Sequence, residues 1–194
     1  MPNPDYIQLY EIAEPQGGNF SAAQARQAGF SWELLSYHAK TGRLERVSHG
    51  IYRLRQFPSS PYEDLFIAQL RAGPDSVVSH DSALALYELS DAVPSEVHVT
   101  IPRTASRRRA GIRQHTNRIV PEEVTGREGL RVTTVARTIA DVARSGLSED
   151  RIRQVIEEAI DRGLVGFTDL RDAANKYGGR TRRIVGRYLQ ENSR

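Results

Sequence analysis

The amino-terminal part of the chain shows three short helical patterns followed by two short strands, an order that few folds accommodate. Apolar residues recur at helical spacing over residues 5–14, which predicts an amphipathic first helix. Ser21 and Ser31 are of the residue type that caps helix N-termini, and they predict helices over residues 22–28 and 32–41. A glycine directly after each of these two segments is the usual residue at a helix C-terminus.

A hairpin follows the third helix. Residues 44–47 and 51–54 predict two short strands, and the sequence Ser-His-Gly at residues 48–50 supplies the turn between them. The two-residue joint at 29–30 is short enough to set the second and third helices at a steep angle. Three helices followed by a β-hairpin predict a winged helix-turn-helix domain over residues 1–56.

The third helix is the element that such a fold inserts into the major groove of DNA. Leu35, His38 and Ala39 form the inward stripe of this helix, so the exposed residues of the helix and the hairpin are the candidate DNA contacts. These candidates are Ser31, Trp32, Ser36, Tyr37, Lys40, Arg43, Arg46, Ser48 and His49. Glu33 opposes phosphate binding unless it accepts a hydrogen bond from a cytosine amine. In the alternative interpretation, Trp32 and Tyr37 pack against the next domain, and the basic residues are only solvated side chains of the surface.

A second domain is predicted after a linker. The sequence Phe-Pro-Ser-Ser-Pro at residues 57–61 has linker composition, and residues 62–194 form the rest of the chain. Helices are expected over residues 62–71, 82–89, 135–143, 149–162, 168–176 and 182–190, and strands over residues 97–101, 111–116 and 130–133. The predicted fold class is α+β and mainly helical: a winged helix-turn-helix, then an α+β domain that ends in a helical tail.

Two arginine clusters hold the excess positive charge. The formal net charge is only +3, but residues 57–102 have one basic and seven acidic side chains, whereas residues 103–118 have six basic and none acidic. The candidate contacts to phosphate or to a protein partner are Arg103, Arg107, Arg108, Arg109 and Arg113. A second cluster near the C-terminus contains Arg180, Arg182, Arg183 and Arg187. Both clusters can equally be solvated faces, or pair with the acidic segment.

Signatures of an enzyme are missing from the sequence. It lacks the glycine-rich loops that bind nucleotides and the Gly-x-Ser-x-Gly motif of hydrolases. Cysteine is absent, which excludes disulfides, thiolate metal sites and thiol nucleophiles. Asp75, Glu96 and His98 have the outline of a metal nuclease but lack a nearby lysine and a second convincing acid. We therefore expect a protein that is not an enzyme and that holds no metal and no cofactor.

The remaining titratable pairs are expected to be structural. His80 and Asp81 have no third ligand at helical spacing, so His80 is expected at a helix start, and His98 and His115 are also expected to be structural. The Arg and Asp of the sequence ARTIAD, four residues apart at 137 and 141, predict an ion pair on one helix. If this pair is buried, it organises the second domain.

The chain is expected to be cytoplasmic. Its longest apolar stretches are only a few residues, far below the roughly 20 that cross a bilayer. The first five residues lack the basic and apolar regions of a signal peptide. The absence of cysteine agrees with a reducing compartment.

Five segments, taken in their order along the chain, resemble a known family. They are FSAAQARQAG (residues 20–29), LERVSHGIYR (44–53), VSHDSALALY (78–87), VHVTIP (97–102) and GLRVTTVARTIAD (129–141). This series is similar to AbiEi-type antitoxins of abortive-infection AbiE toxin–antitoxin systems, in their short two-domain form. The resemblance covers roughly residues 5–145.

The resemblance implies a function in transcription regulation and phage defence. Members of this family bind inverted or direct repeats upstream of their own operon through the winged helix and act as repressors. Their C-terminal domain counteracts a toxin of nucleotidyltransferase fold, directly or functionally. The expected partners are therefore operator DNA and such a toxin, with no membrane, and the loop from Arg103 to Arg113 is a candidate contact to either partner. The chain is expected to be a monomer or a dimer that binds DNA cooperatively.

Three alternatives remain open from the sequence. The chain can be a DNA-binding repressor without a toxin partner, or an interaction module whose winged helix has lost DNA binding. It can also be an RNA-binding protein that depends on Arg107–Arg109 rather than on the wing.

Overall fold

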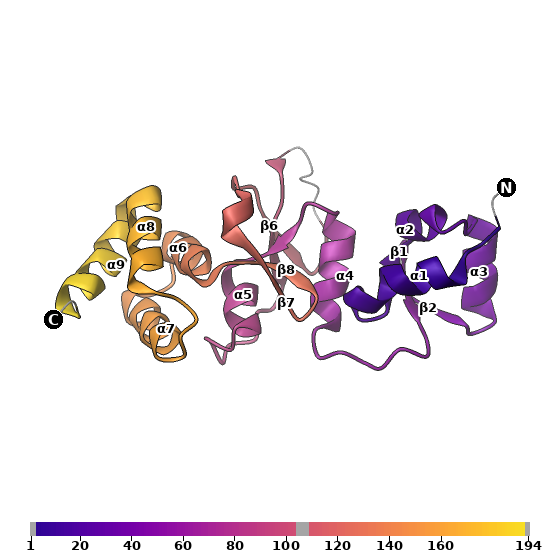
Figure 1. The fold of residues 1–194 in the computed structure, drawn as a ribbon, viewed down its shortest axis with the longest axis horizontal. Coiled ribbons are helices and arrows are strands. Elements are labelled where there is room, and N and C mark those ends of the chain that lie inside the picture. The colour runs from indigo at the N-terminus through magenta and orange to yellow at the C-terminus, as the bar shows by residue number, and fades with distance from the viewer. Residues whose placement is uncertain (1–2, 104–108, 193–194) are drawn as a thin grey trace. The chain divides into compact units, whose positions relative to one another are not determined.

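The computed structural model of the chain describes residues 3–103 and 109–192 (Figure 1). Packing divides it into two compact units, which we call unit 1 (residues 1–76 and 126–130) and unit 2 (residues 77–125 and 131–194). The fold class is α+β and mainly helical, as the sequence predicts, with two sheets among the described residues. Within the same residues, every helix is too short or too polar to cross a membrane.

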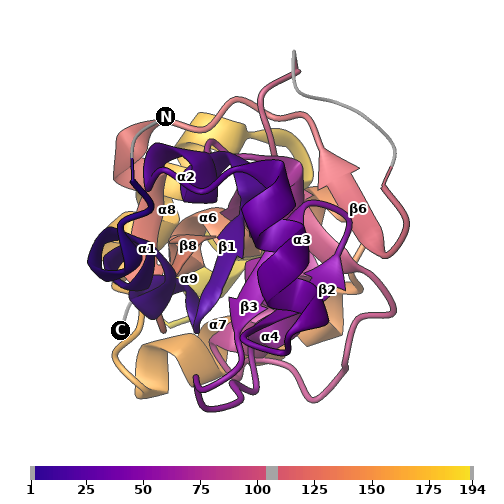
Figure 2. The same ribbon diagram turned by 90° about the vertical axis from the view of Figure 1, so that its right-hand side faces the viewer.

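Unit 1 has the order of elements of a winged helix-turn-helix (Figure 2). Its elements are α1 (Tyr6–Ala13), the 3-10 helix η1 (Glu14–Gln16), β1 (Asn19–Ser21), α2 (Ala22–Gln27), α3 (Trp32–Lys40), β2 (Leu44–Ser48), β3 (Ile51–Leu54) and α4 (Glu63–Ala72). The three predicted helices and the predicted hairpin are confirmed. The sequence does not predict β1, because three residues are too few for an alternating pattern to stand out. This strand pairs antiparallel with β3, which lies between β1 and β2.

Side-chain caps fix where the first three helices begin. The carboxylate of Asp5 accepts hydrogen bonds from two amides in the first turn of α1. Ser21 and Gln24 form a reciprocal capping box at the start of α2. The hydroxyl of Ser31 accepts a hydrogen bond from the amide of Leu34 at 3.2 Å. Because each cap is worth about 1 kcal/mol, short helices such as α2 and α3 depend on them.

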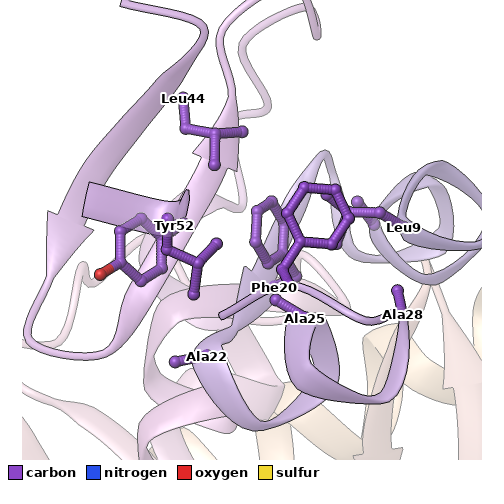
Figure 3. Close-up of a cluster of buried hydrophobic side chains, with 10 residues drawn as sticks. Leu9, Phe20, Ala22, Ala25, Ala28, Leu44 and Tyr52 are labelled. Carbon is purple, nitrogen blue, oxygen red and sulfur yellow. The ribbon is translucent and has the colours of Figure 1, made fainter. Parts of the chain in front are cut away.

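A buried cluster joins the helices of unit 1 to its sheet (Figure 3). Its members are Leu9, Ala13, Phe20, Ala22, Ala25, Ala28, Phe30, Leu35, Leu44 and Tyr52. Phe20 of β1 is opposite Tyr52 of β3, and their stacked rings have centroids 6.1 Å apart. The core thus ties the hairpin to the helices that precede it.

Helix α4 packs with unit 1, although it follows the linker predicted at residues 57–61. Phe66 is 5% exposed, and a Cβ added at Gly17 would lie 3.0 Å from its ring. The Nε atom of Arg53 on β3 lies 3.3 Å from the carboxylate of Glu63. The boundary between the two packed units therefore falls after α4 and not at the linker. Whether residues 1–56 and 62–194 fold as separate domains stays a prediction.

Substitution Phe66→Ala should destabilise unit 1, because it removes a buried ring that packs on the winged helix. We expect the free energy of unfolding to fall by about 3 kcal/mol, as for other buried phenylalanines. The single tryptophan, Trp32, lies in unit 1, so its fluorescence during urea unfolding reports on this unit. Substitution Phe167→Ala in α8 is the control and should leave the tryptophan transition in place. An unchanged transition in Phe66→Ala would show that α4 is not part of the unit.

Unit 2 combines a mixed sheet with a group of helices. Its elements are β4 (Val77–Val78), α5 (His80–Leu86), β5 (Val97–Thr100), β6 (Ile112–His115), η3 (Pro121–Glu123), β7 (Val124–Arg127), β8 (Leu130–Thr133), α6 (Val135–Ser145), α7 (Glu149–Asp161), α8 (Phe167–Tyr177) and α9 (Gly179–Glu191), with the tip of β7–β8 counted in unit 1. The strand order is β6-β5-β4-β8-β7. Strand β5 is parallel to β6 and antiparallel to β4, which is parallel to β8. Helices α6 to α9 pack against one another (Figure 1).

The predicted helices and strands of this region are present, and the sequence missed only short ones. Strand β4 has two residues, too few for a pattern. Strand β7 contains a glycine and has no buried residue, so nothing marks it as a strand before its pairing is known.

Helix α6 holds a buried ion pair. The side chains of Arg137 and Asp141 are 1% and 0% exposed, with 2.9 Å between Nε and Oδ2. Burial raises the pKa of Asp141, although the guanidinium beside it acts in the opposite direction. The Nη1 atom of Arg137 also donates to the carboxylate of Glu123 at 2.7 Å and to the hydroxyl of Tyr177 at 2.9 Å. The pair therefore links α6 to η3 and α8 and organises unit 2.

Substitution Arg137→Met should destabilise unit 2 strongly, because it leaves the carboxylate of Asp141 without a cation in the interior, whereas Glu123 keeps Lys176 at 2.6 Å. A loss of about 3 kcal/mol or more is expected for breaking a buried pair from one side. Urea unfolding followed by far-ultraviolet circular dichroism measures this loss. Substitution Arg171→Met removes an exposed arginine from α8 and should change stability by less than about 0.5 kcal/mol. Equal effects of the two substitutions would contradict the structural function of Arg137.

Candidate nucleic-acid interface

Helix α3 turns one side to the core and the other to solvent. Leu35 and His38 are buried, as predicted, and Ala39 is half-buried. Trp32 and Tyr37 are 54% and 58% exposed, which is unusual for residues of their size. The exposed side of the helix therefore presents aromatic rings as well as polar groups.

A hollow of about 500 Å³ lies between α3 and the wing formed by β2 and β3. Its lining consists of Trp32, Ser36, Ala39, Lys40, Arg46, His49, Gly50 and Tyr52. Five of the nine predicted DNA contacts thus surround a single concave surface, although they come from two elements. In Figure 2, α3 lies beside β2, the strand that contributes Arg46 to this hollow. We call this surface the α3–wing hollow.

The other four predicted contacts lie around this hollow rather than in it. Ser31 caps α3 at its N-terminus. The free backbone amides of the first turn point out of this end of the helix, where they can bind a phosphate. Tyr37 is exposed beside His38, with 5.5 Å between the centroids of the two rings. Ser48 is half-buried at the end of β2, and Arg43 lines a different hollow beside α1.

The wing is short and has a defined tip. Gly50 has φ +71°, a conformation that other residues rarely adopt, and a Cβ there would meet nothing within 4 Å. Glycine is therefore required here because of the backbone conformation of the turn, and not because a side chain would clash. The pairing of β2 with β3 shifts register between Glu45 and Ser48, which bends the strand. The guanidinium of Arg46 lies 3.3 Å from Nδ1 of His49, so the two exposed side chains lie side by side on the wing.

Positive charge is available on this surface. Within the described residues, Lys40, Arg43 and Arg46 form no ion pair with a carboxylate, so their charges are free to meet phosphates. Glu33 is the exception to this pattern. It is fully exposed, and a backbone hydrogen bond at the helix start, with help from Ser31, lowers its pKa. It is therefore a carboxylate at the edge of the surface.

The loop from Arg103 to Arg113 is only partly described. Arg107 and Arg108 lie outside the described residues. Arg103 and Arg113 are exposed, whereas Arg109 is half-buried next to a bridge with Ile112. Whether this loop contacts phosphate or a protein stays a prediction.

The arginines of the helical tail divide into two kinds. Arg180 donates to the carbonyl oxygens of Ala143 and Leu147 and so caps the end of α6. Arg187 pairs with Glu149 at 2.6 Å. Arg180 therefore takes part in packing and Arg187 in an exposed ion pair, and Arg182 and Arg183 are also exposed.

Unit 2 brings together three histidines that the sequence analysis treated separately. The rings of His80 and His115 stack with centroids 3.5 Å apart, and His98 lies 5.2 Å from His115. Asp81 is 3.2 Å from Nδ1 of His98. The sequence does not show this cluster, because the three residues meet only through the pairing of β4 with β5 and of β5 with β6. Among residues 3–103 and 109–192, no group of three or more ligating side chains is arranged to hold a metal ion.

The histidine cluster is neutral at pH 7. Burial lowers the pKa of His80 to about 2 and that of His115 to about 4, and the neighbouring histidines add to both shifts. Burial also lowers the pKa of His98, although Asp81 opposes the shift. His80 has φ +53°, a strained conformation for a residue with a side chain, so packing must stabilise it.

Unit 2 should lose stability in acid because of this cluster. The unfolded chain binds protons on these histidines near pH 6.5, whereas the folded chain binds one on His115 only near pH 4. Stability is therefore complete above about pH 7 and falls as the pH drops from about 6.5 towards 4. Urea midpoints measured by circular dichroism should decline less steeply over this window in His115→Gln. His49→Gln, a change on the wing, is the control and should remain as acid-sensitive as the wild type. If His115→Gln were also as acid-sensitive as the wild type, the assignment of this effect to the histidine cluster would be wrong.

Unit 1, with its capped third helix and its short wing, defines a winged helix-turn-helix of the class found in DNA-binding proteins. Residues 8–55 match the family described as "Transcriptional regulator, AbiEi antitoxin". This match confirms the predicted resemblance for the segment from α1 to β3, which contains all nine predicted DNA contacts. The matched segment lies within unit 1.

The chain also aligns with a solved structure, the crystal structure of the RV2827C protein from Mycobacterium tuberculosis. The sequence identity is 13%, the TM-score is 0.45, and the alignment covers 92% of this chain and 79% of that one. Comparison with curated proteins gives no match.

Proposed function

We propose that the protein represses its own operon by binding DNA through unit 1 and that it counteracts a toxin of nucleotidyltransferase fold through unit 2. The observation that supports the DNA-binding half most directly is the α3–wing hollow. Two of its cations, Lys40 and Arg46, lie on different elements and are not paired with carboxylates in the described part of the chain. A surface of this kind suits a phosphate backbone that passes between a recognition helix and a wing.

The proposed binding mode assigns different tasks to the two elements. The start of α3 enters the major groove, where Ser36 and the exposed indole of Trp32 meet base edges and thymine methyl groups. Lys40 and Arg46 contact phosphates of the backbone that passes between the helix and the wing, and His49 at the tip of the wing meets the same backbone. Phosphate contacts fix the register of the protein, and the contacts of α3 select the sequence.

The antitoxin half rests on the match of residues 8–55 to an antitoxin family, on the resemblance of residues 78–87, 97–102 and 129–141 to such antitoxins, and on the division of the chain into two units. Unit 2 has its own core and a buried charged network. All the residues that line the α3–wing hollow belong to unit 1. We assign toxin neutralisation to unit 2, by direct binding or through the target of the toxin. DNA binding and protection should therefore be separable by substitution.

Substitution of Lys40→Ala together with Arg46→Ala should weaken binding to the DNA upstream of the gene by about tenfold or more. Loss of two phosphate contacts should also reduce the magnitude of the log–log salt slope by about 1.8. Fluorescence anisotropy at several salt concentrations measures both quantities. Substitution of Arg151→Ala together with Arg171→Ala removes the same charge from exposed positions of unit 2 and is the matched control. Equal losses in the two variants would assign the effect to net charge and refute the hollow as the interface.

The same Lys40 and Arg46 variant should still protect cells that express a nucleotidyltransferase-like toxin encoded beside its gene. Retained protection with lost DNA binding supports the division of labour between the units. Loss of both would show that protection requires unit 1. The absence of any such neighbouring gene would favour a repressor without a toxin partner.

A further inference from the structure

We propose that two copies of this chain associate through the outer face of α1, with each copy seating its α1 against a hollow on the other. The proposal concerns unit 1 alone and is independent of DNA binding and of a toxin. Four observations support it: an apolar helix face, a hollow beside that face, unpaired charges of both signs around them, and a fixed conformation of the face.

The first observation is the exposure of apolar residues on α1. Leu9 and Ala13 bury one side of the helix in the core. Tyr6 and Tyr10 lie at the edge of this side and are 51% and 47% exposed, and Ile7 lies beyond them and is 74% exposed. Single exposed apolar residues are common, but three of them on one eight-residue helix form a patch. An isoleucine exposed to this degree gains most from a partner that covers it.

The second observation is a hollow of about 580 Å³ that adjoins this helix. Tyr6 and Tyr10 form the wall on the side of α1, and Phe30 and Leu44 are among its apolar residues. Arg43 and Arg55 also line it, from the chain on either side of the hairpin. The hollow lies within unit 1 and is separate from the α3–wing hollow in its lining residues.

The third observation is the distribution of unpaired charge. Glu11 and Glu14 are exposed on α1 or at its end, and Arg43 and Arg55 are exposed at the hollow. None of these four residues forms an ion pair with any residue that the structure describes. One copy therefore presents two carboxylates on its helix and two guanidinium groups on its hollow, and neither set is neutralised within that copy.

The fourth observation is that the face is rigid before any partner binds. The hydroxyl of Tyr6 lies 2.9 Å from Nε2 of His38, and its ring contacts Phe30 edge-on with centroids 5.0 Å apart. Burial and the nearby Arg43 lower the pKa of His38, so this histidine is neutral and adds no charge to the hollow. A face that is already ordered loses little conformational entropy on association.

A second copy is the partner that these features select. Because one chain has the apolar helix, the hollow and both signs of charge, a two-fold axis satisfies all of them twice. In this arrangement Ile7 of each copy enters the hollow of the other, beside the wall that Tyr10 forms. Glu11 and Glu14 then meet Arg43 and Arg55 in two symmetric sets. An unrelated protein would have to provide both an apolar helix and a matching arrangement of charges.

Sedimentation velocity of the full chain, from about 5 to about 300 µM and without DNA, tests the proposal. The expected result is a reversible monomer–dimer equilibrium with a Kd of about 10 µM, as suits a small interface. Substitution Ile7→Asp should raise the Kd by at least about tenfold, since it places a charge in the apolar contact. Substitution Gln8→Arg changes an exposed residue on another side of the same helix and should leave the Kd unchanged.

A charge exchange makes the test independent of any loss of folding. Substitution of Glu11→Arg with Glu14→Arg should raise the Kd by about tenfold or more, and Arg43→Glu with Arg55→Glu should also raise it. All four changes in one chain should bring the Kd back towards the wild-type value, because the reversed charges again attract across the two-fold axis. Arg43 is also a predicted DNA contact, and the measurement is therefore made without DNA.

Two results would overturn the proposal. One is a wild-type chain that stays monomeric at the highest concentration. The other is a dimer whose Kd is insensitive to Ile7→Asp and to the charge reversals, since the copies would then meet elsewhere.

Discussion

The pairing of β1 with β3 is the interaction on which the candidate interface depends. β1 has only three residues, yet it places Phe20 opposite Tyr52 and attaches the hairpin to the helices through a stacked aromatic pair. Without this attachment the wing would be a two-stranded hairpin, which is marginally stable on its own in water. The fixed hairpin sets Arg46 and His49 at a defined place relative to α3. The α3–wing hollow is thus a consequence of core packing as much as of surface sequence.

Arginine has two distinct functions in this chain, and burial separates them. Arg137 is completely buried and shares its guanidinium among Asp141, Glu123 and Tyr177, so its charge is consumed in holding unit 2 together. Arg43 and Arg46 are exposed and form no ion pair with described residues, so their charges remain available to partners. Composition alone gives both kinds the same weight. The structure shows which arginines can meet a phosphate or a carboxylate of another molecule.

Local signals made much of the fold predictable from the sequence. Ser21 and Ser31 mark helix starts because capping is a local interaction, and Gly50 marks the wing because few other residues adopt its φ angle. Most of the helices and the α+β class followed from such signals and from apolar spacing.

What the sequence missed depends on contacts between distant residues. α4 looks like the start of a second domain until the contact of Phe66 with Gly17 is known. His80 and His115 are far apart along the chain and stack only once the strands are paired. In the candidate interface, the sequence predicted the residues but not that five of the nine surround one hollow, while Arg43 lies beside another.

The central claim is that unit 1 recognises a DNA sequence. Its most direct test is the affinity of the wild-type protein for DNA from upstream of its own gene beside scrambled DNA of the same length, by fluorescence anisotropy at two salt concentrations. The account predicts tighter binding to the upstream DNA and a log–log salt slope of roughly −4.5 to −7, as five to eight phosphate contacts would give. Equally weak binding to both DNAs would contradict it and would make the winged helix a module for protein contacts.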